Sequence, residues 1–354
     1  MRVRWGATGK RVLTGVWRAY TTYQRFVRLS TFGLSAMMPL LGAATVNRHL
    51  DGRHIWGMVA VAFAFHQFGY VLNDVVDLPV DRRQPRRASY PLVSGLVTPR
   101  QALAFALLQI PVALLLNSWL GGSGASYLAL LIAFALGAVY DLFGKRTAVP
   151  PLLDAVQAGA WVSMIFYGTA VAGAAPTPLT WTLAGFVATY IILVNGGHGA
   201  LRDVRSDVEA GVRTTAILLG ARADGCGRLY IPRRLAVYML LLQLLASGLI
   251  LWLLASDLFA YAGVMHWGVG TVIPLLQFAC IWLTVKTVRA REEQSLKTYA
   301  YAYIVLALVS LILLFLPYLT PPLRTAVLIT YFAPLVVFDT FYGTIESLWH
   351  RLGA

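Results

Sequence analysis

The chain has 354 residues, of which 58% are hydrophobic and only 12% are charged, about half the charged fraction of a typical soluble domain. A chain so poor in charge cannot cover a water-facing surface, and its apolar excess excludes intrinsic disorder. Two cysteines, Cys226 and Cys280, form no CxxC pair and indicate neither a disulfide scaffold nor a zinc or redox motif. The composition therefore predicts a polytopic membrane protein.

Nine apolar segments are long enough to cross a bilayer core, which takes about 20 residues of α-helix. A tenth apolar stretch, near residues 325–345, is interrupted by Pro334 and Asp339 and is expected either to span or to lie in the interface as a half-helix. Glycine- and proline-rich turns separate the segments, and we see neither a soluble domain nor a cleavable signal peptide. The nine predicted spans lie near residues 31–47, 55–73, 100–117, 125–141, 152–172, 179–198, 233–256, 268–288 and 298–318.

Lysine and arginine are distributed very unequally between the two faces of the predicted bundle. With the N-terminus inside, 26 of the 29 lie on one face and only Arg48, Arg53 and Arg324 on the other. Positively charged loops mark the cytoplasmic side, so we expect the N-terminus and the ends of the even-numbered spans in the cytoplasm. Topology and anionic lipid headgroups account for the formal net charge of +14, and nucleic-acid binding is not expected.

Two groups of aspartates lie at the cytoplasmic ends of the second and sixth predicted spans. Asp74, Asp77 and Asp81 fall within about 80° of one another if the helix continues at about 100° per residue. Asp203 and Asp207 are four residues apart, again on one helix face. Five carboxylates around one cavity would repel one another without cations, and hard oxygen donors favour Mg²⁺, which usually brings substrate phosphates. The alternative is that these are solvated loop residues that balance nearby arginines.

Basic residues follow both aspartate groups and are candidates for phosphate binding. Arginine forms bidentate hydrogen bonds with phosphate, and lysine supplies a point charge. Each of them, taken alone, is also explained as a positive-inside residue. The candidates are Arg86, Arg87, Lys145, Arg146, Arg202, Arg205 and Arg213.

The first aspartate group and its flank resemble the UbiA superfamily of intramembrane prenyltransferases. The run from Asn73 to Asp81 is similar to that family's NDxxDxxxD motif in all four positions. Residues 90–95, YPLVSG, are similar to its RPLxSG segment, with Tyr90 where many members have arginine. The resemblance extends over about residues 30–320, and the first motif is highly specific in this context.

The second aspartate group and the loop after the fourth span resemble the same family. Residues 203–220 are similar to its second DxxxD motif and tail, and Tyr140 with Lys145-Arg146 to its Tyr…Lys-Arg element, here with one extra residue in the spacing. His198 and Gly199 lie where many ubiquinone-type members have a tyrosine. Because these departures fall near the expected diphosphate and acceptor, the identity of the acceptor is not carried over.

The resemblance implies an all-α bundle of nine transmembrane helices around a central cavity. It also implies transfer of a prenyl group from a prenyl diphosphate to an acceptor, with release of diphosphate. We expect the acceptor to be lipophilic and aromatic, and the sequence indicates no obligate protein partner. The expected division is a basic N-terminal arm over residues 1–30, the catalytic bundle over 31–320 and a C-terminal apolar segment over 321–354. Two Mg²⁺ ions are expected on Asp74, Asp77, Asp81, Asp203 and Asp207, and contacts to substrate from Asn73, Arg86, Tyr140, Lys145, Arg146 and Arg213.

Polar residues inside the predicted spans are candidates for orienting the acceptor or acting as a base, because such groups usually mark functional sites. Gln67 lies two turns before Asp74, and Asn195 and His198 precede the second motif. The alternative for each is an interhelical hydrogen bond, which we favour for His66. Asp154 and Gln157 form a further pair, three residues apart in the fifth span.

Two other functions remain open on the sequence. A UbiA-type terpene cyclase would keep the metal site but quench the carbocation within its own chain. A transporter or lipid-binding protein would carry its acids nearer the bilayer midplane, whereas these acids lie at span ends.

Overall fold

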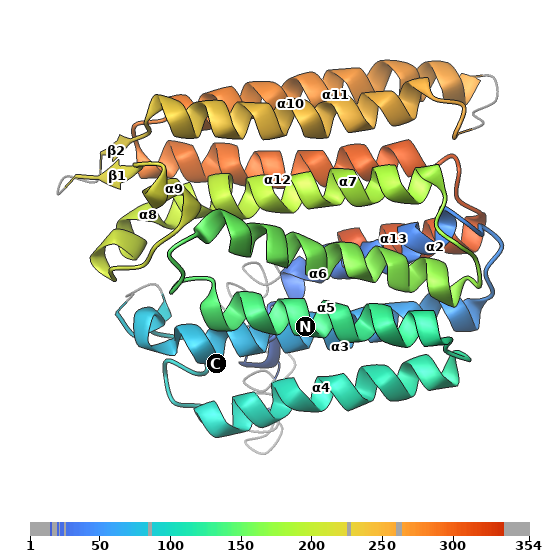
Figure 1. Ribbon diagram of the computed structural model, residues 1–354, viewed down its shortest axis with the longest axis horizontal. Helices are drawn as coiled ribbons and strands as arrows, with labels where there is room; N and C mark the ends of the chain where they lie inside the picture. Colours follow the sequence, from blue (N-terminus) through green and yellow to red (C-terminus); the bar gives the residue numbers. More distant parts are fainter. Residues whose placement is uncertain are drawn as a thin grey trace, which may run out of the picture.

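The computed structural model describes residues 15, 20, 22–24, 26–83, 87–224, 228–259 and 264–335. Long helices lie side by side in these residues, and a group of short elements, α8, α9, β1 and β2, gathers at one end of the bundle (Figure 1). The fold is all-α, as predicted, apart from one two-stranded antiparallel sheet. The first half contains η1 (Leu29–Thr31), α2 (Phe32–Ala44), α3 (Gly52–Asp81), α4 (Pro99–Trp119), α5 (Gly124–Phe143), α6 (Pro150–Val171) and α7 (Pro178–Leu193). The second half contains the π-helical turn η3 (Val194–Gly199), α8 (Ala200–Glu209), α9 (Thr215–Leu218), β1 (Arg222–Ala223), β2 (Leu229–Tyr230), α10 (Arg233–Ala255), α11 (Val264–Arg289), α12 (Glu293–Phe315) and α13 (Pro321–Pro334).

The length and apolar composition of the helices fit a multi-pass integral membrane protein. Seven helical runs of the described residues are long and apolar enough to cross a bilayer. They are α3, α4, α5, the run from α7 through α8, α10, α11 and α12. The predicted nine spans correspond to nine helices in position, but α2 has only 13 residues, and α6, with 22 residues, is not among the seven.

The tenth apolar stretch is described only in part. Its beginning forms α13, a helix of 14 residues that starts at Pro321 and includes Pro334. Asp339 and the rest of that stretch lie outside the described residues, so the choice between spanning and interfacial stays a prediction. The described part packs against α2, where a Cβ at Gly33 would meet the Tyr331 backbone at 2.8 Å.

The short helix α2 lies in the interior of the bundle and packs directly against α6. A Cβ at Gly42 would collide with the backbone carbonyl of Ile165, and one at Gly168 with that of Pro39. Lipid tails are as apolar as the side chains that they would replace, so packing within a membrane depends on close backbone approach at small residues. The two glycines therefore fix the distance between α2 and α6.

We expect Gly168→Ala to destabilise the protein by about 1–3 kcal/mol, because the new methyl group meets backbone that cannot rotate away. The matched control is Gly248→Ala in α10, where nothing lies within 4 Å of the new Cβ and alanine should gain about 0.5–1 kcal/mol of helix stability. Thermal unfolding in detergent should show a lower midpoint for the first variant only. Equal midpoints in the two variants would contradict the proposed helix contact.

Candidate active site

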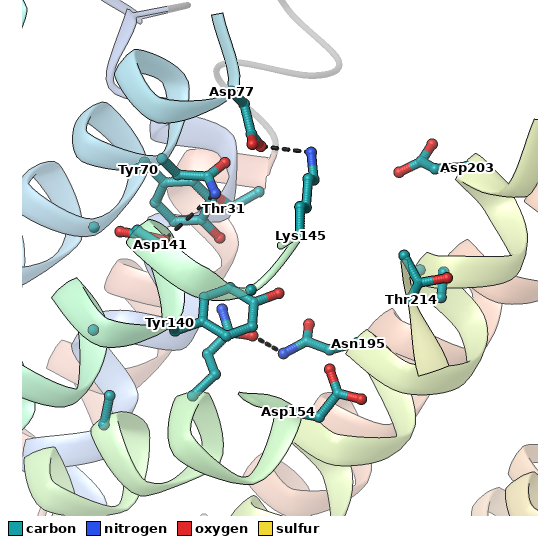
Figure 2. A pocket seen from close by; sticks show the side chains of 18 of the residues that line it. Thr31, Tyr70, Asp77, Tyr140, Asp141, Lys145, Asp154, Asn195, Asp203 and Thr214 are labelled. Carbon is teal, nitrogen blue, oxygen red and sulfur yellow. Dashed lines mark hydrogen bonds and ion pairs between the residues drawn. The ribbon is translucent and has the colours of Figure 1, made fainter. Parts of the chain in front are cut away.

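One cavity of about 370 Å³ lies where α3, α5, α6, η3 and α8 approach one another. Figure 2 shows the side chains of these elements converging on it. The structure thus brings residues from both halves of the sequence to one place. Of the residues predicted from the sequence, its lining includes Asn73, Asp77, Arg87, Tyr140, Lys145, Asp154, Gln157, Asn195, Arg202, Asp203 and Asp207. Its lining does not include Asp74, Asp81, Gln67, Arg146, His198, Arg205 or Arg213, and Arg86 lies outside the described residues.

The first aspartate motif occupies the last two turns of α3. The helix continues through Pro79, as expected, and Asp74, Asp77 and Asp81 are all buried. A buried carboxylate needs a partner, and each of the three has a basic one. Lys145 Nζ lies 2.6 Å from Asp77 Oδ2 (Figure 2).

Arg87 bridges the other two carboxylates of the first motif. Its Nη1 lies 3.0 Å from Asp81 Oδ2 and 3.6 Å from Asp74 Oδ1. The Arg87 guanidinium also lies over the ring of Tyr90, 5.1 Å from the centroid. Tyr90 is the residue that departs from the family's RPLxSG segment, and here it supports an arginine.

Arg28 lines the cavity, although its place in the predicted basic arm gives it no distinctive sequence signal. Its guanidinium is ion-paired with Asp74 and lies 5.2 Å from the centroid of the Tyr70 ring. It is the one non-glycine residue of the described part with a left-handed backbone, at φ 48°, a strained conformation that clusters at functional sites. Burial disfavours its charge, but the Asp74 carboxylate raises the pKa of Arg28 above its ordinary value, so it stays protonated.

His66 and Gln67 hold the segment before α2 against α3. The imidazole of His66 is hydrogen-bonded to the Val27 carbonyl and to the Ser35 hydroxyl, both at 2.9 Å. The Tyr23 hydroxyl donates to Gln67 Oε1 at 3.0 Å. Hydrogen bonds to other segments thus engage both residues, and a contact of Gln67 with substrate stays a prediction. Their contacts position the segment that carries Arg28.

The second aspartate motif lies on α8, across the cavity from the first. Figure 2 shows Asp203 opposite Asp77 and Lys145. Arg202 Nη2 lies 2.8 Å from Asp203 Oδ2, and Asp207, which is buried, also lines the cavity. The facing arrangement of the two motifs is the one expected from their positions at the ends of even-numbered spans.

Lys145 enters the cavity, but the two arginines expected beside it do not. Arg146 and Arg213 are exposed and are absent from the lining. Arg28 and Arg87 supply the positive charge there instead. Spacing in the sequence could not distinguish these residues, because a loop can turn either of two neighbouring side chains inward.

His198 is a predicted site residue that does not line the cavity. It is fully buried, its ring stacks on Tyr303 at 4.1 Å, and its Nε2 lies 3.5 Å from the Thr284 hydroxyl. The π-helical turn explains this, because its wider i→i+5 repeat separates the directions of Asn195 and His198. Asn195 lines the cavity, and His198 packs away from it.

A second polar group lies below the aspartate motifs. Asn195 donates a hydrogen bond to Gln157, and the Thr215 hydroxyl donates one to Asp154 Oδ2. Figure 2 shows Asp154, Asn195 and Tyr140 together on this side of the cavity, below Lys145. Thr215 belongs to the tail of the second motif, and its spacing from Asp154 in the sequence gave no signal for the contact.

The donor set fits a hard divalent cation. All five motif acids are aspartates, and Asp81 Oδ1 is buried with no hydrogen-bond partner in the described part. Arginine and lysine neutralise the first three carboxylates in this structure. Within the described ranges no three carboxylate, histidine or cysteine groups converge closely enough to form a complete metal site. Ligands would therefore have to exchange their basic partners for metal.

The fold and the cavity together define an integral membrane protein with a carboxylate-rich site at one end of a helical bundle. A model of the UbiA prenyltransferase family matches residues 34–300. The chain therefore belongs to that family. It is similar to a 4-hydroxybenzoate octaprenyltransferase from Pseudoalteromonas atlantica, with 32% identity over 168 residues, which are 47% of this chain and 57% of that protein. The matched region thus spans little more than half the length of that relative.

Two solved structures share the fold. A UbiA homolog from Aeropyrum pernix K1, in its apo form, matches with a TM-score of 0.60 and 19% identity over 81% of this chain and 98% of that one. A UbiA homolog from Archaeoglobus fulgidus bound to GPP and Mg²⁺ matches with a TM-score of 0.59 and 15% identity over 82% of this chain and 99% of that one. At these identities the likeness establishes the architecture.

Proposed function

We propose that the protein transfers the prenyl group of a prenyl diphosphate to a lipophilic aromatic acceptor, with release of diphosphate and dependence on Mg²⁺. The observation that carries the proposal is that aspartates of α3 and α8 line one cavity together with basic side chains. One relative is a 4-hydroxybenzoate octaprenyltransferase, and one structure of the same fold holds GPP and Mg²⁺. Both support the same chemistry here.

The proposed metal ligands are the aspartates of the two motifs, with Asn73 as an oxygen ligand to metal or diphosphate. When bound, Mg²⁺ neutralises negative charge on the departing diphosphate. We place two ions there, because the two motifs lie on opposite walls of the cavity (Figure 2). The proposed ligands are Asp74, Asp77, Asp81, Asp203 and Asp207.

The chain's own basic groups complete the proposed diphosphate site. Lys145, Arg28 and Arg87 line the cavity and are already held at the aspartate end. Cations fixed where negative charge develops lower the barrier without reorganising during the reaction. With Mg²⁺ on the carboxylates, these three basic side chains would be free to bind diphosphate oxygens.

Aromatic side chains and the membrane protect the reacting prenyl group. Phe65 and Trp161 line the cavity, packed edge to face with ring centroids 5.9 Å apart. Tyr70 and Tyr140 line it as well. Aromatic faces stabilise a desolvated cation by about 2 kcal/mol or more, and exclusion of water prevents premature hydrolysis. Tyr140 is thus proposed as a substrate contact, as the resemblance implies.

The proposal is tested with purified protein, Mg²⁺ and geranyl diphosphate, with and without a phenolic acceptor. We expect a prenylated acceptor in the complete mixture and only slow hydrolysis without acceptor, both identified by mass spectrometry. Replacing Mg²⁺ by excess chelator should stop the reaction. A cyclic hydrocarbon or alcohol formed without acceptor would instead establish the terpene cyclase.

We also propose that the N-terminus and both aspartate motifs face the cytoplasm. The proposal rests on the distribution of lysine and arginine, since 26 of the 29 lie on one face of the predicted bundle. Thr147→Cys, in a protein that also carries Cys226→Ala and Cys280→Ala, is labelled with a membrane-impermeant reagent in intact and in opened cells. We expect labelling only in opened cells; labelling in intact cells would contradict the proposed orientation.

A further inference from the structure

Asp154 lines the cavity but has no role in the metal and diphosphate site proposed above. It lies in the second turn of α6 and is only 7% exposed, yet it lines the cavity. Its Oδ2 accepts a hydrogen bond from Thr215. Within the described residues no protein group is hydrogen-bonded to Oδ1, so that oxygen is available to a ligand in the cavity.

Residues of η3 and α9 pack closely against the Asp154 side chain. A Cβ at Gly196 would lie 2.6 Å from Asp154 Oδ2 and 3.3 Å from the Thr215 side chain, so glycine is needed for η3 to pass. Asn195, one residue earlier on the same turn, reaches the cavity and hydrogen-bonds Gln157, which lies one turn after Asp154 on α6. The Asp154 carboxylate and the amides of Asn195 and Gln157 are thus held in place by contacts among α6, η3 and α9.

The positively charged side chains of the cavity lie at the aspartate motifs and not around Asp154. The basic residues that line it are Arg28, Arg87, Lys145 and Arg202, and each is ion-paired with an aspartate of one of the two motifs. In the described part no ion pair involves Asp154. The floor of the cavity, formed by Asp154, Gln157 and Asn195, therefore offers a carboxylate and two amides as hydrogen-bonding groups. Among the described residues it has no cation that would neutralise an anionic ligand.

Building on the prenyl transfer proposed above, we propose that Asp154 binds and deprotonates the hydroxyl group of the acceptor, and that this acceptor is a phenol with no carboxylate at that end. A hydroxyl donates to Asp154 Oδ1, whereas a second carboxylate would be repelled by it. The Thr215 hydroxyl fixes the other carboxylate oxygen. Asn195 and Gln157 border the same floor and limit the position of the ring.

The group transfer balances as follows. The hydroxyl proton passes to Asp154 as electron density moves into the phenol ring. A ring carbon next to the hydroxyl-bearing carbon forms a bond to C1 of the prenyl group, and the C1–oxygen bond breaks with its electron pair on the diphosphate. Loss of the proton from that ring carbon, with reprotonation of the oxygen, restores the phenol, so one proton is released with each diphosphate.

Asp154→Asn tests the inference, because its amide oxygen can still accept from Thr215 but is too weak a base to take a phenolic proton. With geranyl diphosphate and methyl 4-hydroxybenzoate, a neutral phenol, we expect kcat to fall about 10²–10³-fold, within the range for loss of a general base. Mg²⁺-dependent binding of geranyl diphosphate and the thermal unfolding midpoint should not change. The matched control on α6 is Ser163→Ala, whose hydroxyl bonds only within its own helix in this structure; its kcat should equal that of the wild type.

The choice of acceptor gives a second readout. Wild-type protein should prefer methyl 2-hydroxybenzoate over 2-hydroxybenzoate, whose carboxylate lies beside the hydroxyl, by at least about tenfold in kcat/KM, and the preference should shrink in Asp154→Asn. Unchanged kcat in Asp154→Asn, a wild-type preference for the carboxylate, or bound geranyl diphosphate without transfer to either phenol would overturn the inference while leaving the diphosphate site intact. Failure of the wild type to bind geranyl diphosphate with Mg²⁺ would overturn the proposed function itself.

Discussion

Asp74→Ala and Asp207→Ala are each expected to lower prenyl transfer by about 10³-fold or more, since each removes a carboxylate that holds charge against the leaving diphosphate. The two residues come from opposite motifs, so equal losses would show that both motifs serve one site. In Asp74→Ala, Arg28 also loses its ion-pair partner, and Arg87 keeps only Asp81. Turnover of geranyl diphosphate with acceptor, measured over a range of Mg²⁺ concentrations, gives the effect.

The control for Asp207→Ala is Glu209→Gln on the same helix. Glu209 is exposed and pairs with Arg205 at 3.2 Å, away from the cavity lining. An exposed ion pair contributes little, so this variant should retain wild-type turnover. Both alanine variants should remain folded in detergent. Full activity in either of them would remove the basis for the proposed metal site.

Lys145→Met is expected to lower kcat/KM for the prenyl diphosphate by about 10²–10³-fold, the usual cost of losing one preorganised group that stabilises developing charge. Lys145 lies 2.6 Å from Asp77 and lines the cavity. Methionine keeps most of the length of the side chain and removes the charge. Steady-state kinetics at saturating Mg²⁺ and acceptor give the ratio.

Arg146→Met is the natural comparison, because the adjacent residue is exposed and absent from the lining. Its effect on kcat/KM should be several-fold at most. A loss equal to that of Lys145→Met would mean that the loop presents both side chains to the diphosphate, and the orientation of this loop in the structure would then not be the one used in the reaction.

The features that could be predicted from the sequence depend on periodicity within one element. The spacing of Asp74, Asp77 and Asp81 places them on one face of any continuous helix, and α3 does continue to Asp81. The positions of the spans follow from apolar length in the same way. Local spacing determined both, so folding did not alter them.

The remaining site residues depend on contacts between distant segments. Arg28 reaches Asp74 across 46 residues, and Thr215 reaches Asp154 across 61. An arginine in a basic N-terminal arm, or a threonine after an aspartate motif, has no sequence feature that marks it as a site residue. His198 is a candidate on the sequence because it lies just before the second motif, but a six-residue π-helical turn, which spacing alone does not predict, directs its side chain away from the cavity.

The pairing of α2 with α6 has a consequence for how the protein enters the membrane. Helix α2 is too short for an independent span, and α6 is long enough but not apolar enough. The backbones of the two helices are in close contact. A segment of 13 residues is poorly held by lipid alone, and one that carries an aspartate is costly to insert. We therefore expect α2 to be retained in the bilayer only once α6, which is synthesised more than a hundred residues later, is in place to cover it.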